Sequence, residues 1–453
     1  MIKYIQEKFR TRILEGDALT LKTRKNIFLS FLIKFGSVGI GLILVPMTIS
    51  YVNPVQYGIW LTLSSVISWF YFFDIGLGNG LKNKLAESNA LGQFDKSKIY
   101  VSTTYAIIIA VSVIIFILFL IANLFINWNN VLNIPSDPKL NLPLIALIIV
   151  SIFCLQFVFQ LINTVLTACH EPAKVSVLLL IGQVLCLISI FLISRYSHGS
   201  LLILVIVIGG IPLLVTLVSN FWYFFRQFGY LRPSIKDIDL SYARQLLVIG
   251  GAFFVIQIGQ LVLYQTDNII VTQLFGPKEV TVFNMAYKLF SIVITVFTIG
   301  ITPYWSAFTE AYHKQDFDWI KATFGKLKKG WLLIIVLTII LTIISPFIFK
   351  LWLKDMVTIP MNLSISMAVY VIASSFHMLC CLFLNGIGKI RLQLYLYVIC
   401  FFFNIPLSIY LGKHFGIQGI TYANVIILLL MGVVLYVQCN KILNKKAIGI
   451  WDR

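Results

Sequence analysis

Residues 331–353 read WLLIIVLTIILTIISPFIFKLWL and contain a single charged residue, Lys350. A helix needs about 20 predominantly apolar residues to cross the hydrocarbon core of a bilayer. The stretch therefore predicts a membrane-spanning helix. On both sides of it, the sequence alternates between similar long apolar segments and short polar connections.

The composition of the whole chain agrees with this local pattern. The 453 residues are 59% hydrophobic and 11% charged, with a mean hydropathy of +0.93, whereas soluble domains carry about 25% charged residues. We therefore expect an all-α polytopic membrane protein with almost no residues left for a soluble catalytic domain. The formal net charge of +18 would indicate nucleic acid in a soluble protein. In this chain it mostly reflects membrane topology, and no nucleic-acid partner is expected.

Hydropathy predicts twelve spans. We expect two pseudo-symmetric six-helix lobes, 27–225 and 247–440, around a central polar cavity, with a cytoplasmic linker at 226–246. Residues 1–26 lack the features of a signal peptide and are expected to form a basic cytoplasmic arm, and 441–453 a cytoplasmic tail. The predicted spans are 27–52, 56–80, 99–126, 142–169, 174–194, 200–225, 247–272, 279–306, 331–353, 360–386, 391–412 and 416–440.

The basic residues fix the expected orientation. With twelve spans, 27 of the 35 Lys and Arg residues fall on the side of the two termini, six on the opposite side and two inside the membrane. Cytoplasmic loops are enriched in Lys and Arg. Both termini are therefore expected in the cytoplasm.

The second half of the chain aligns with the first at an offset of 223 residues without a gap. Both halves begin with two long helices followed by a charged cytoplasmic loop. Repeats that pack around an axis, with a substrate path at their interface, are a common transporter architecture. The aligned landmarks are Pro54 with Pro277, Glu87 with Glu310, and Phe94-Asp95 with Phe317-Asp318.

Polar side chains follow one face of several predicted helices. In the seventh helix they recur at steps of 3, 4 and 3, which confines them to an arc under about 90° wide. Similar stripes run along the first and eighth helices. These faces are expected to line a substrate cavity, although Ser, Thr and Gln also bond across membrane helix interfaces. The cavity candidates are Lys34, Gln257, Gln260, Tyr264, Asn284, Lys288 and Ser291.

Charged residues inside apolar segments are the stronger candidates. A charge at mid-membrane costs roughly 3 kcal/mol, so such residues usually line a wet cavity. Lys288 and Asp267 are expected at depths within ~6 Å of each other. They could neutralise each other as an ion pair, or separate as a gate when an anionic substrate arrives. Asp267 and Asp74 are gate or ion-coupling candidates, although Asp74 lies close to the cytoplasmic boundary.

Further candidates lie elsewhere in the chain. Gln156, Gln160 and Asn163 recur at helical spacing in the fourth helix, as a wall for sugar hydroxyls or as a packed interface. His377 could take up a proton or be a buried structural histidine. The hinge candidates are Pro46, which removes a backbone donor, and the pair Gly250 and Gly251.

Enzymatic function is disfavoured. The seven cysteines form no disulfide framework of the secreted kind, and no set of metal ligands and no nucleophile beside a base is visible. No cofactor or metal is expected. The longest outer loop, 127–141, is short for a membrane glycosyltransferase, ligase or polymerase, which would show an extended outer loop or a clustered acidic motif.

Short motifs mark both halves of the chain. In the first half they are Val45-Pro46, Pro54-Val55-Gln56-Tyr57-Gly58 and Phe73-Asp74-Ile75-Gly76-Leu77-Gly78. In the second half they are Asp267-Asn268-Ile269-Ile270, Gly276-Pro277 and Ala286-Tyr287-Lys288-Leu289. These motifs resemble those of the polysaccharide biosynthesis/export family, whose Wzx-type flippases belong to the multidrug/oligosaccharidyl-lipid/polysaccharide exporter superfamily. The similarity covers nearly the whole chain in helix number, loop pattern and two-lobed organisation.

The resemblance implies a flippase in the bacterial cytoplasmic (inner) membrane. It would move an undecaprenyl-pyrophosphate-linked oligosaccharide, such as an O-antigen or capsule repeat unit, to the outer leaflet by alternating access. It implies coupling to H⁺ or Na⁺, with membrane lipids, a polysaccharide polymerase and chain-length machinery as partners. Lys34 and Lys288 would hold the pyrophosphate, and the amides would meet sugar hydroxyls. Cavity charges in related flippases are often arginines, and here only two lysines lie well inside the membrane.

Two other functions stay open. A multidrug exporter of the same superfamily would extrude organic cations and should carry acidic cavity residues. Lys34 and Lys288 argue against it, while Asp74 and Asp267 keep it open. A membrane polymerase or ligase for the same glycans is the alternative from the enzyme class, disfavoured by the short outer loops.

Overall fold

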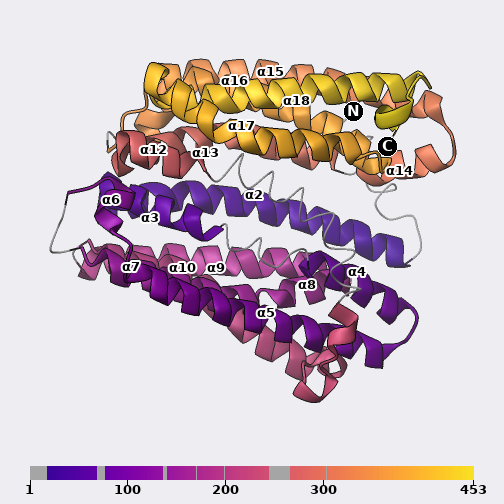
Figure 1. Ribbon diagram of the computed structural model, residues 1–453, viewed down its shortest axis with the longest axis horizontal. Coiled ribbons are helices and arrows are strands. Elements are labelled where there is room, and N and C mark those ends of the chain that lie inside the picture. Colours follow the sequence, from indigo (N-terminus) through magenta and orange to yellow (C-terminus); the bar gives the residue numbers. More distant parts are fainter. Residues whose placement is uncertain are drawn as a thin grey trace, which may run out of the picture. The chain divides into compact units, whose positions relative to one another are not determined.

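The computed structural model describes residues 18–68, 77–135, 140–169, 171–197, 199–243, 266–302, 304–354 and 356–452 (Figure 1). Within these ranges the regular elements are all helices. Nine of the described helices are long and apolar enough to cross a membrane. A tenth candidate, Gly36–Val52 with Pro54–Val66, is interrupted at Asn53. The expected all-α membrane class is confirmed.

The chain divides into two compact units. In unit 1, α2 packs along α9, while α10 lies against α7 and α9, and α5 packs on α7. Its helices are α2 (Ala18–Val52), α4 (Leu77–Ala90), α5 (Phe94–Asn123), α7 (Leu142–Phe159), α8 (Leu161–Ala168), α9 (Pro172–Tyr196) and α10 (Leu201–Arg226), followed by the 3₁₀ turns η2 (Gly229–Leu231), η3 (Ile235–Asp237) and η4 (Leu240–Tyr242).

Unit 2 takes in most of the second half of the chain and two helices from the first half. Its interior is built around α16, which packs against α13, α14, α15 and α18. Its helices are α3 (Pro54–Ser68), α6 (Trp128–Leu132), α12 (Asp267–Phe275), α13 (Pro277–Ile301), α14 (Tyr304–His313), α15 (Phe317–Leu353), α16 (Met361–Gly386), α17 (Arg391–Phe415), α18 (Ile417–Leu443) and η5 (Gly449–Asp452).

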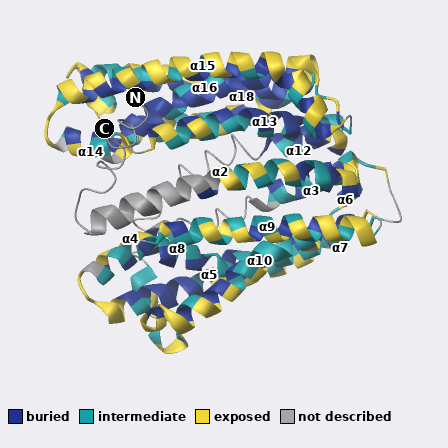
Figure 2. Ribbon diagram, turned by 180° about the vertical axis from the view of Figure 1, so that it is seen from behind, coloured by how far each residue is buried: buried dark blue, intermediate teal, exposed yellow. Residues whose placement is uncertain are grey.

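Burial separates the helices that form the interior from those that face lipid. Figure 2 shows α16 largely buried, whereas one side of α15 is exposed along its length. The exposed side chains of α15 are large and apolar, among them Leu333, Ile343 and Phe347. An apolar exposed face on a helix of this length is expected where the surrounding medium is the lipid bilayer.

Some predicted boundaries differ from the structure. The loop expected at 81–98 is largely helical, because α4 and the first turn of α5 occupy it. The predicted second helix, 56–80, is described as α3 up to Ser68 and as the start of α4 from Leu77, and residues 69–76 between them lie outside the described ranges. The loop expected at 307–330 is also largely helical. Amphipathic helices next to the membrane carry charges, so hydropathy alone assigns them to loops.

The repeat places the same breaks 223 residues apart. In both halves a residue with positive φ precedes a helix that starts with proline, and a second such residue precedes a long apolar helix. Proline at the first helical position uses a φ that already suits the helix. The equivalent pairs are Asn53 (φ 90°) with Gly276 (φ 86°), Pro54 with Pro277, Gly92 (φ 69°) with Gln315 (φ 60°), and Phe94 with Phe317.

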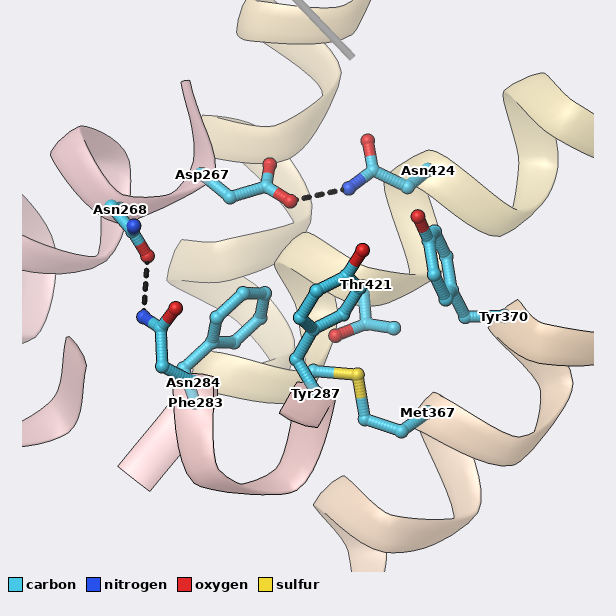
Figure 3. Close-up of a pocket in the computed structure, with 9 residues that line it drawn as sticks. All are labelled: Asp267, Asn268, Phe283, Asn284, Tyr287, Met367, Tyr370, Thr421 and Asn424. Atoms are coloured by element: carbon cyan, nitrogen blue, oxygen red, sulfur yellow. Dashed lines mark hydrogen bonds between the residues drawn. The ribbon is translucent and has the colours of Figure 1, made fainter. Parts of the chain in front are cut away.

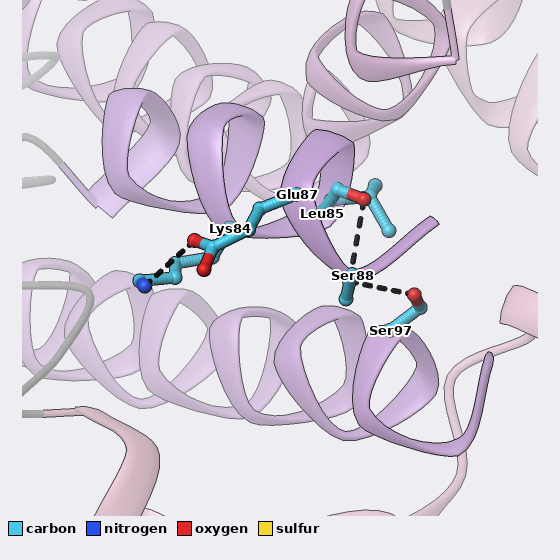
Figure 4. Close-up of polar contacts among 5 residues, drawn as sticks. All are labelled: Lys84, Leu85, Glu87, Ser88 and Ser97. Atoms are coloured by element: carbon cyan, nitrogen blue, oxygen red, sulfur yellow. Dashed lines mark hydrogen bonds and ion pairs between the residues drawn. The ribbon is translucent and has the colours of Figure 1, made fainter. Parts of the chain in front are cut away.

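The corner between α4 and α5 is closed by polar contacts (Figure 4). The hydroxyls of Ser88 and Ser97 are 2.7 Å apart, and Ser97 also donates to Asn89 Oδ1 at 2.8 Å. Lys84 Nζ lies 2.8 Å from Glu87 Oε2 on the outer face of α4. Glu310 of α14, the repeat equivalent of Glu87, forms an ion pair with Lys314, the residue that follows this helix. The charged loops of both halves therefore contain a helix with a local ion pair.

Candidate functional site

A polar pocket of about 220 Å³ lies inside unit 2, between α12, α13, α16 and α18 (Figure 3). Four membrane-associated helices contribute a carboxylate, three amides, a hydroxyl and two phenols to its wall. It is lined by Asp267, Asn268, Phe283, Asn284, Tyr287, Met367, Tyr370, Thr421 and Asn424.

Asp267 is held by a relay of amides. It is the first residue of α12 and is 7% exposed. Its Oδ2 accepts a hydrogen bond of 2.7 Å from Asn424 Nδ2 on α18. Asn424 Oδ1 in turn accepts one of 2.7 Å from Asn404 Nδ2 on α17. Asn424, which is held by Asn404, therefore orients one carboxylate oxygen. A hydrogen bond to a charged acceptor contributes about 1.5–3 kcal/mol.

Two oxygens at this wall have no hydrogen-bond partner among the described residues. They are Asp267 Oδ1 and Thr421 Oγ1, and both are buried. Leaving a buried donor or acceptor unsatisfied costs about 1–3 kcal/mol. Such atoms in a native structure commonly mark a place for a water, an ion or a ligand. The pocket is therefore suited to a ligand that coordinates these oxygens or donates hydrogen bonds to them.

The rest of the pocket wall combines amides and aromatic rings. Asn284 Nδ2 donates to Asn268 Oδ1 at 2.7 Å (Figure 3). The rings of Tyr287 and Tyr370 meet edge to face, with centroids 6.1 Å apart. Tyr287 is 37% exposed and Tyr370 only 4%. Amides that both donate and accept, beside aromatic faces, suit a ligand that carries hydroxyls on an apolar ring.

Lys288 is on α13 but does not line this pocket. It is partly buried, and no hydrogen bond or ion pair joins its ammonium to another described residue. Asp267 and Lys288 do not form the ion pair that the sequence left open, because Asp267 bonds to Asn424 instead. Ser291 donates to the backbone oxygen of Lys288 at 2.9 Å, so its hydroxyl is engaged within the helix.

Several predicted residues lie outside the described ranges. For one further residue, Lys34 in α2, the backbone is described but the side chain is not. Pro46 lies within α2, which continues to Val52. The predicted residues outside the described ranges are Asp74, Gly250, Gly251, Gln257, Gln260 and Tyr264.

The fourth predicted helix belongs to unit 1 and is broken at Gln160, between α7 and α8. Gln156 Oε1 accepts from Thr216 on α10 at 3.1 Å, which is the packed-interface role. Asn163 Oδ1 is buried without a hydrogen-bond partner among the described residues. These amides are not part of the pocket in unit 2.

His377 is buried in α16 and faces a thiol. Its Nε2 lies 3.3 Å from Cys381 Sγ, one turn further along the helix. Its ring also meets Tyr397 of α17 edge to face, with centroids 6.0 Å apart. These contacts are those of a packed histidine within unit 2, and His377 does not line the pocket.

Several pocket residues were not among the candidates predicted from the sequence. Thr421 and Asn424 are one turn apart in α18, and Asn404 lies in the middle of an apolar run. That spacing is a signal, because polar side chains three or four residues apart share one face of a helix. Tyr287 and Tyr370 gave no comparable signal, since tyrosine is common in membrane helices near the interface.

Apolar helices of spanning length that enclose a polar, partly unsatisfied pocket define a membrane transporter. The chain belongs to the polysaccharide biosynthesis protein family, whose sequence pattern matches residues 23–293. The MatE pattern matches residues 252–410. The family expected from the sequence motifs is confirmed.

Similar proteins are assigned to O-antigen export. An O-antigen export protein of Yersinia pseudotuberculosis is 22% identical over 358 residues, covering 74% of this chain and 76% of its own length. An O-antigen transporter of Salmonella typhi is 20% identical over 407 residues, covering 87% and 90%. The chain is thus a transporter of the polysaccharide export type.

Solved structures with the same fold include multidrug transporters. An inward-facing MATE family transporter of the MOP superfamily superposes with a TM-score of 0.70 at 12% identity, over 92% of this chain and 95% of that one. A MOP superfamily transporter from Pyrococcus furiosus, described for the reverse polarity of its binding pocket, gives a TM-score of 0.61 at 13% identity, over 97% and 99%. At these identities the likeness shows the fold alone.

Proposed function

We propose that this protein moves a lipid-linked oligosaccharide from the cytoplasmic to the outer leaflet of the bacterial cytoplasmic membrane by alternating access. Its family and its relatives assigned to O-antigen export support polysaccharide as the cargo. The observation that carries the proposal is the pocket of Asn268, Asn284, Asn424 and two tyrosines inside unit 2. Its amides suit sugar hydroxyls, and its rings suit the apolar face of a sugar.

The size of the pocket limits what it would hold. Pockets for drug-sized ligands have about 300–1,000 Å³, and this one has about 220 Å³. It would therefore contact one sugar of the repeat unit. The lipid tail would stay in the bilayer, and Lys288, which lies outside the pocket, would meet the pyrophosphate by charge.

We also propose that Asp267 couples transport to an ion gradient. Its free Oδ1 and the hydroxyl of Thr421 are hard oxygen ligands, which suit Na⁺, and a carboxylate can equally take a proton. Asp267→Asn should therefore remove the dependence of transport on the coupling gradient. A variant that still responds fully to both Na⁺ and pH gradients would exclude Asp267 as the coupling residue.

The test of function is the sidedness of the lipid-linked oligosaccharide in cells depleted of this protein. An impermeant reagent that modifies sugars, followed by mass spectrometry, reports how much intermediate has reached the outer face. Accumulation on the cytoplasmic face would support the proposal. Intermediates stranded on the outer face would make the protein a polymerase or ligase.

One observation favours a second function, export of organic cations. The pocket is lined by a carboxylate and by no basic residue, as a cation exporter of the same superfamily requires. In that case depletion would leave the lipid intermediates unchanged and raise the sensitivity of cells to cationic drugs. The two assays on one depletion strain therefore separate the two functions.

A further inference from the structure

One face of α3 is fully used in contact with α12 and α13. The residues of this face are Pro54, Gly58, Thr62 and Ser65, which recur at steps of four, four and three, as a single helix face requires. Thr62 is 1% exposed and Ser65 4%. We call this contact the α3 seam.

Three side-chain hydrogen bonds hold the α3 seam. The Thr281 hydroxyl donates to the backbone oxygen of Pro54 at 2.6 Å. The hydroxyls of Thr62 and Thr272 are 2.6 Å apart. Asn268 Nδ2 donates to Ser65 Oγ at 2.6 Å. Such bonds between membrane helices contribute about 0.6–2 kcal/mol each, so the three together hold the helices and still allow them to part.

Gly58 allows the backbones to approach. A Cβ at this position would lie 1.7 Å from the backbone oxygen of Pro277 and 2.5 Å from its carbonyl carbon. Because both obstructing atoms belong to the backbone, no side-chain rotation could relieve the clash. Any residue larger than glycine would push α3 away from α13.

The two repeats contribute equivalent positions to the α3 seam. Gly58 and Thr281 are 223 residues apart, and so are Pro54 and Pro277. Position 58 faces the carbonyl of Pro277, and position 281 bonds the carbonyl of Pro54. The contact is thus formed twice, once in each direction, as two related repeats form it when they meet near an axis.

The α3 seam ends at the polar pocket. Asn268 bonds Ser65 of α3 on one side and Asn284 on the other, and both asparagines line the pocket. Asn268 also follows Asp267 in the chain. A ligand that draws the Asn268 amide toward itself would compete with the bond to Ser65.

We propose that the α3 seam is the outer gate of the transporter, that it is closed in this structure, and that occupancy of the pocket releases it through Asn268. The gate deepens the proposed transport function and rests on it. The outer position follows from the predicted topology, in which Pro54 and Pro277 start helices on the side with few Lys and Arg residues.

The test joins the two sides of the seam covalently. Thr62→Cys and Thr272→Cys are combined in a chain whose seven native cysteines are replaced, because the two hydroxyls are already in contact. Oxidation with copper phenanthroline should crosslink the pair and lower delivery of oligosaccharide to the outer face at least tenfold, and reduction should restore it. The single-cysteine variants are the controls.

Two results would overturn the gate. One is a folded double-cysteine protein that does not crosslink; the other is a crosslinked protein that transports at the rate of the reduced one. A different result would count against the proposed function. It is a reduced protein that does not transport, together with lipid-linked intermediates that stay unchanged when the protein is depleted from cells. The crosslinking yield is measured without any transport assay, so the closed contact is tested in either case.

Gly58→Ala gives a second, independent test. It should open the seam and lower the crosslinking yield of the cysteine pair at least fivefold. Gly300→Ala in α13 is the matched control, because a Cβ there meets no atom within 4 Å, and its yield should equal that of the parent. Equal yields in both variants would show that α3 and α13 do not meet as described.

Discussion

Asn424 is the residue on which the geometry of the carboxylate in unit 2 depends. It donates to Asp267 and is itself held by Asn404. The carboxylate therefore has one oxygen oriented by Asn424, while its other oxygen is buried without a hydrogen-bond partner among the described residues. This division leaves a defined place for an ion or a hydroxyl, because the oriented oxygen fixes the position of the free one.

Asn424→Ala should lower the apparent affinity for the coupling ion by about 10- to 150-fold, since a hydrogen bond to a charged group contributes about 1.5–3 kcal/mol. The measurement is the concentration of Na⁺, or the proton concentration, that gives half-maximal transport. Asn404→Ala should have a smaller effect in the same direction, because it acts one bond further away. Asn444→Ala, at the exposed end of α18, is the control. Unchanged ion dependence in Asn424→Ala would reject the role of the relay.

Lys288→Ala should impair transport of a pyrophosphate-linked substrate without reducing the amount of folded protein. The reason is that no described residue pairs with Lys288, so its removal leaves no unpaired partner behind. The measurement is outer-leaflet oligosaccharide at matched protein abundance, and Lys288→Arg, which keeps the charge, should retain transport. Normal transport by Lys288→Ala at normal abundance would contradict the assignment.

The residues that could be found from the sequence are those whose burial in the membrane has a high free-energy cost. Asp267 could be predicted because a carboxylate inside an apolar segment is costly and usually has a function. Asn284 could be predicted because it shares one helix face with Lys288. Thr421 and Asn424 could not be ranked in this way. A neutral polar side chain is common at helix interfaces, and only the packing of α18 beside α12 gives Asn424 its partner.

At the scale of single elements, glycine determines how closely α17 and α18 approach. A Cβ on Gly419 would lie 2.1 Å from the backbone oxygen of Leu411. Gly419→Ala should therefore lower the free energy of unfolding by about 1–3 kcal/mol, as overpacking does. The measurement is the thermal unfolding midpoint in detergent.

Gly330→Ala is the matched comparison for this prediction. Gly330 lies within α15, and a Cβ there meets no atom within 4 Å. Alanine is favoured over glycine in a helix interior, so this variant should keep or raise the midpoint. A midpoint for Gly419→Ala that is not below that of Gly330→Ala would disprove the close approach.

The linker after α10 is docked on α5. Lys98 Nζ lies 2.8 Å from Asp237 Oδ2, and the backbone amides of Ser234 and Asp239 donate to Ser102 and Thr103. The hydrogen bond from Lys98 lowers the pKa of Asp237 below its usual value of 3.8. The ion pair therefore stabilises docking at neutral pH, and this contribution is lost only as the pH falls through that lowered pKa.

Hydrogen exchange of residues 229–243 should accordingly be unchanged between pH 7 and pH 5 once corrected for the intrinsic rate. Asp237→Asn should raise exchange across the linker at pH 7, because it removes the charge while keeping the shape of the side chain. Lys96→Gln is the control, since Lys96 has no ion pair among the described residues. A rise in exchange already at pH 5 in the parent protein would show that another group holds the linker.

The whole molecule is constrained first by its medium. The length of the apolar segments predicted the helical membrane class, which is confirmed, because a bilayer allows few alternatives. Helical ends were less predictable, and α4 and α14 were taken for loops. Their charges are compatible with a helix at the membrane surface, which a hydropathy window cannot distinguish from a coil.

The topology itself is a prediction for the whole chain. Cysteines placed at 139 and 354 should react with an impermeant maleimide in intact cells, and cysteines at 236 and 445 only after permeabilisation. The reason is the excess of Lys and Arg on the side of the termini. Labelling of position 445 in intact cells would place the C-terminus outside and reverse the direction proposed for transport.

The membership of α3 in unit 2 has a consequence for the synthesis of the protein. Thr62 and Thr272, which bond each other, are 210 residues apart in the chain. At a translation rate of about 5–20 residues per second, roughly 10–40 s pass between the emergence of the two residues from the ribosome. During that interval the polar face of α3 is in the membrane without its native partners. The insertion machinery, or an early neighbour in the nascent chain, must shield that face until the second repeat arrives.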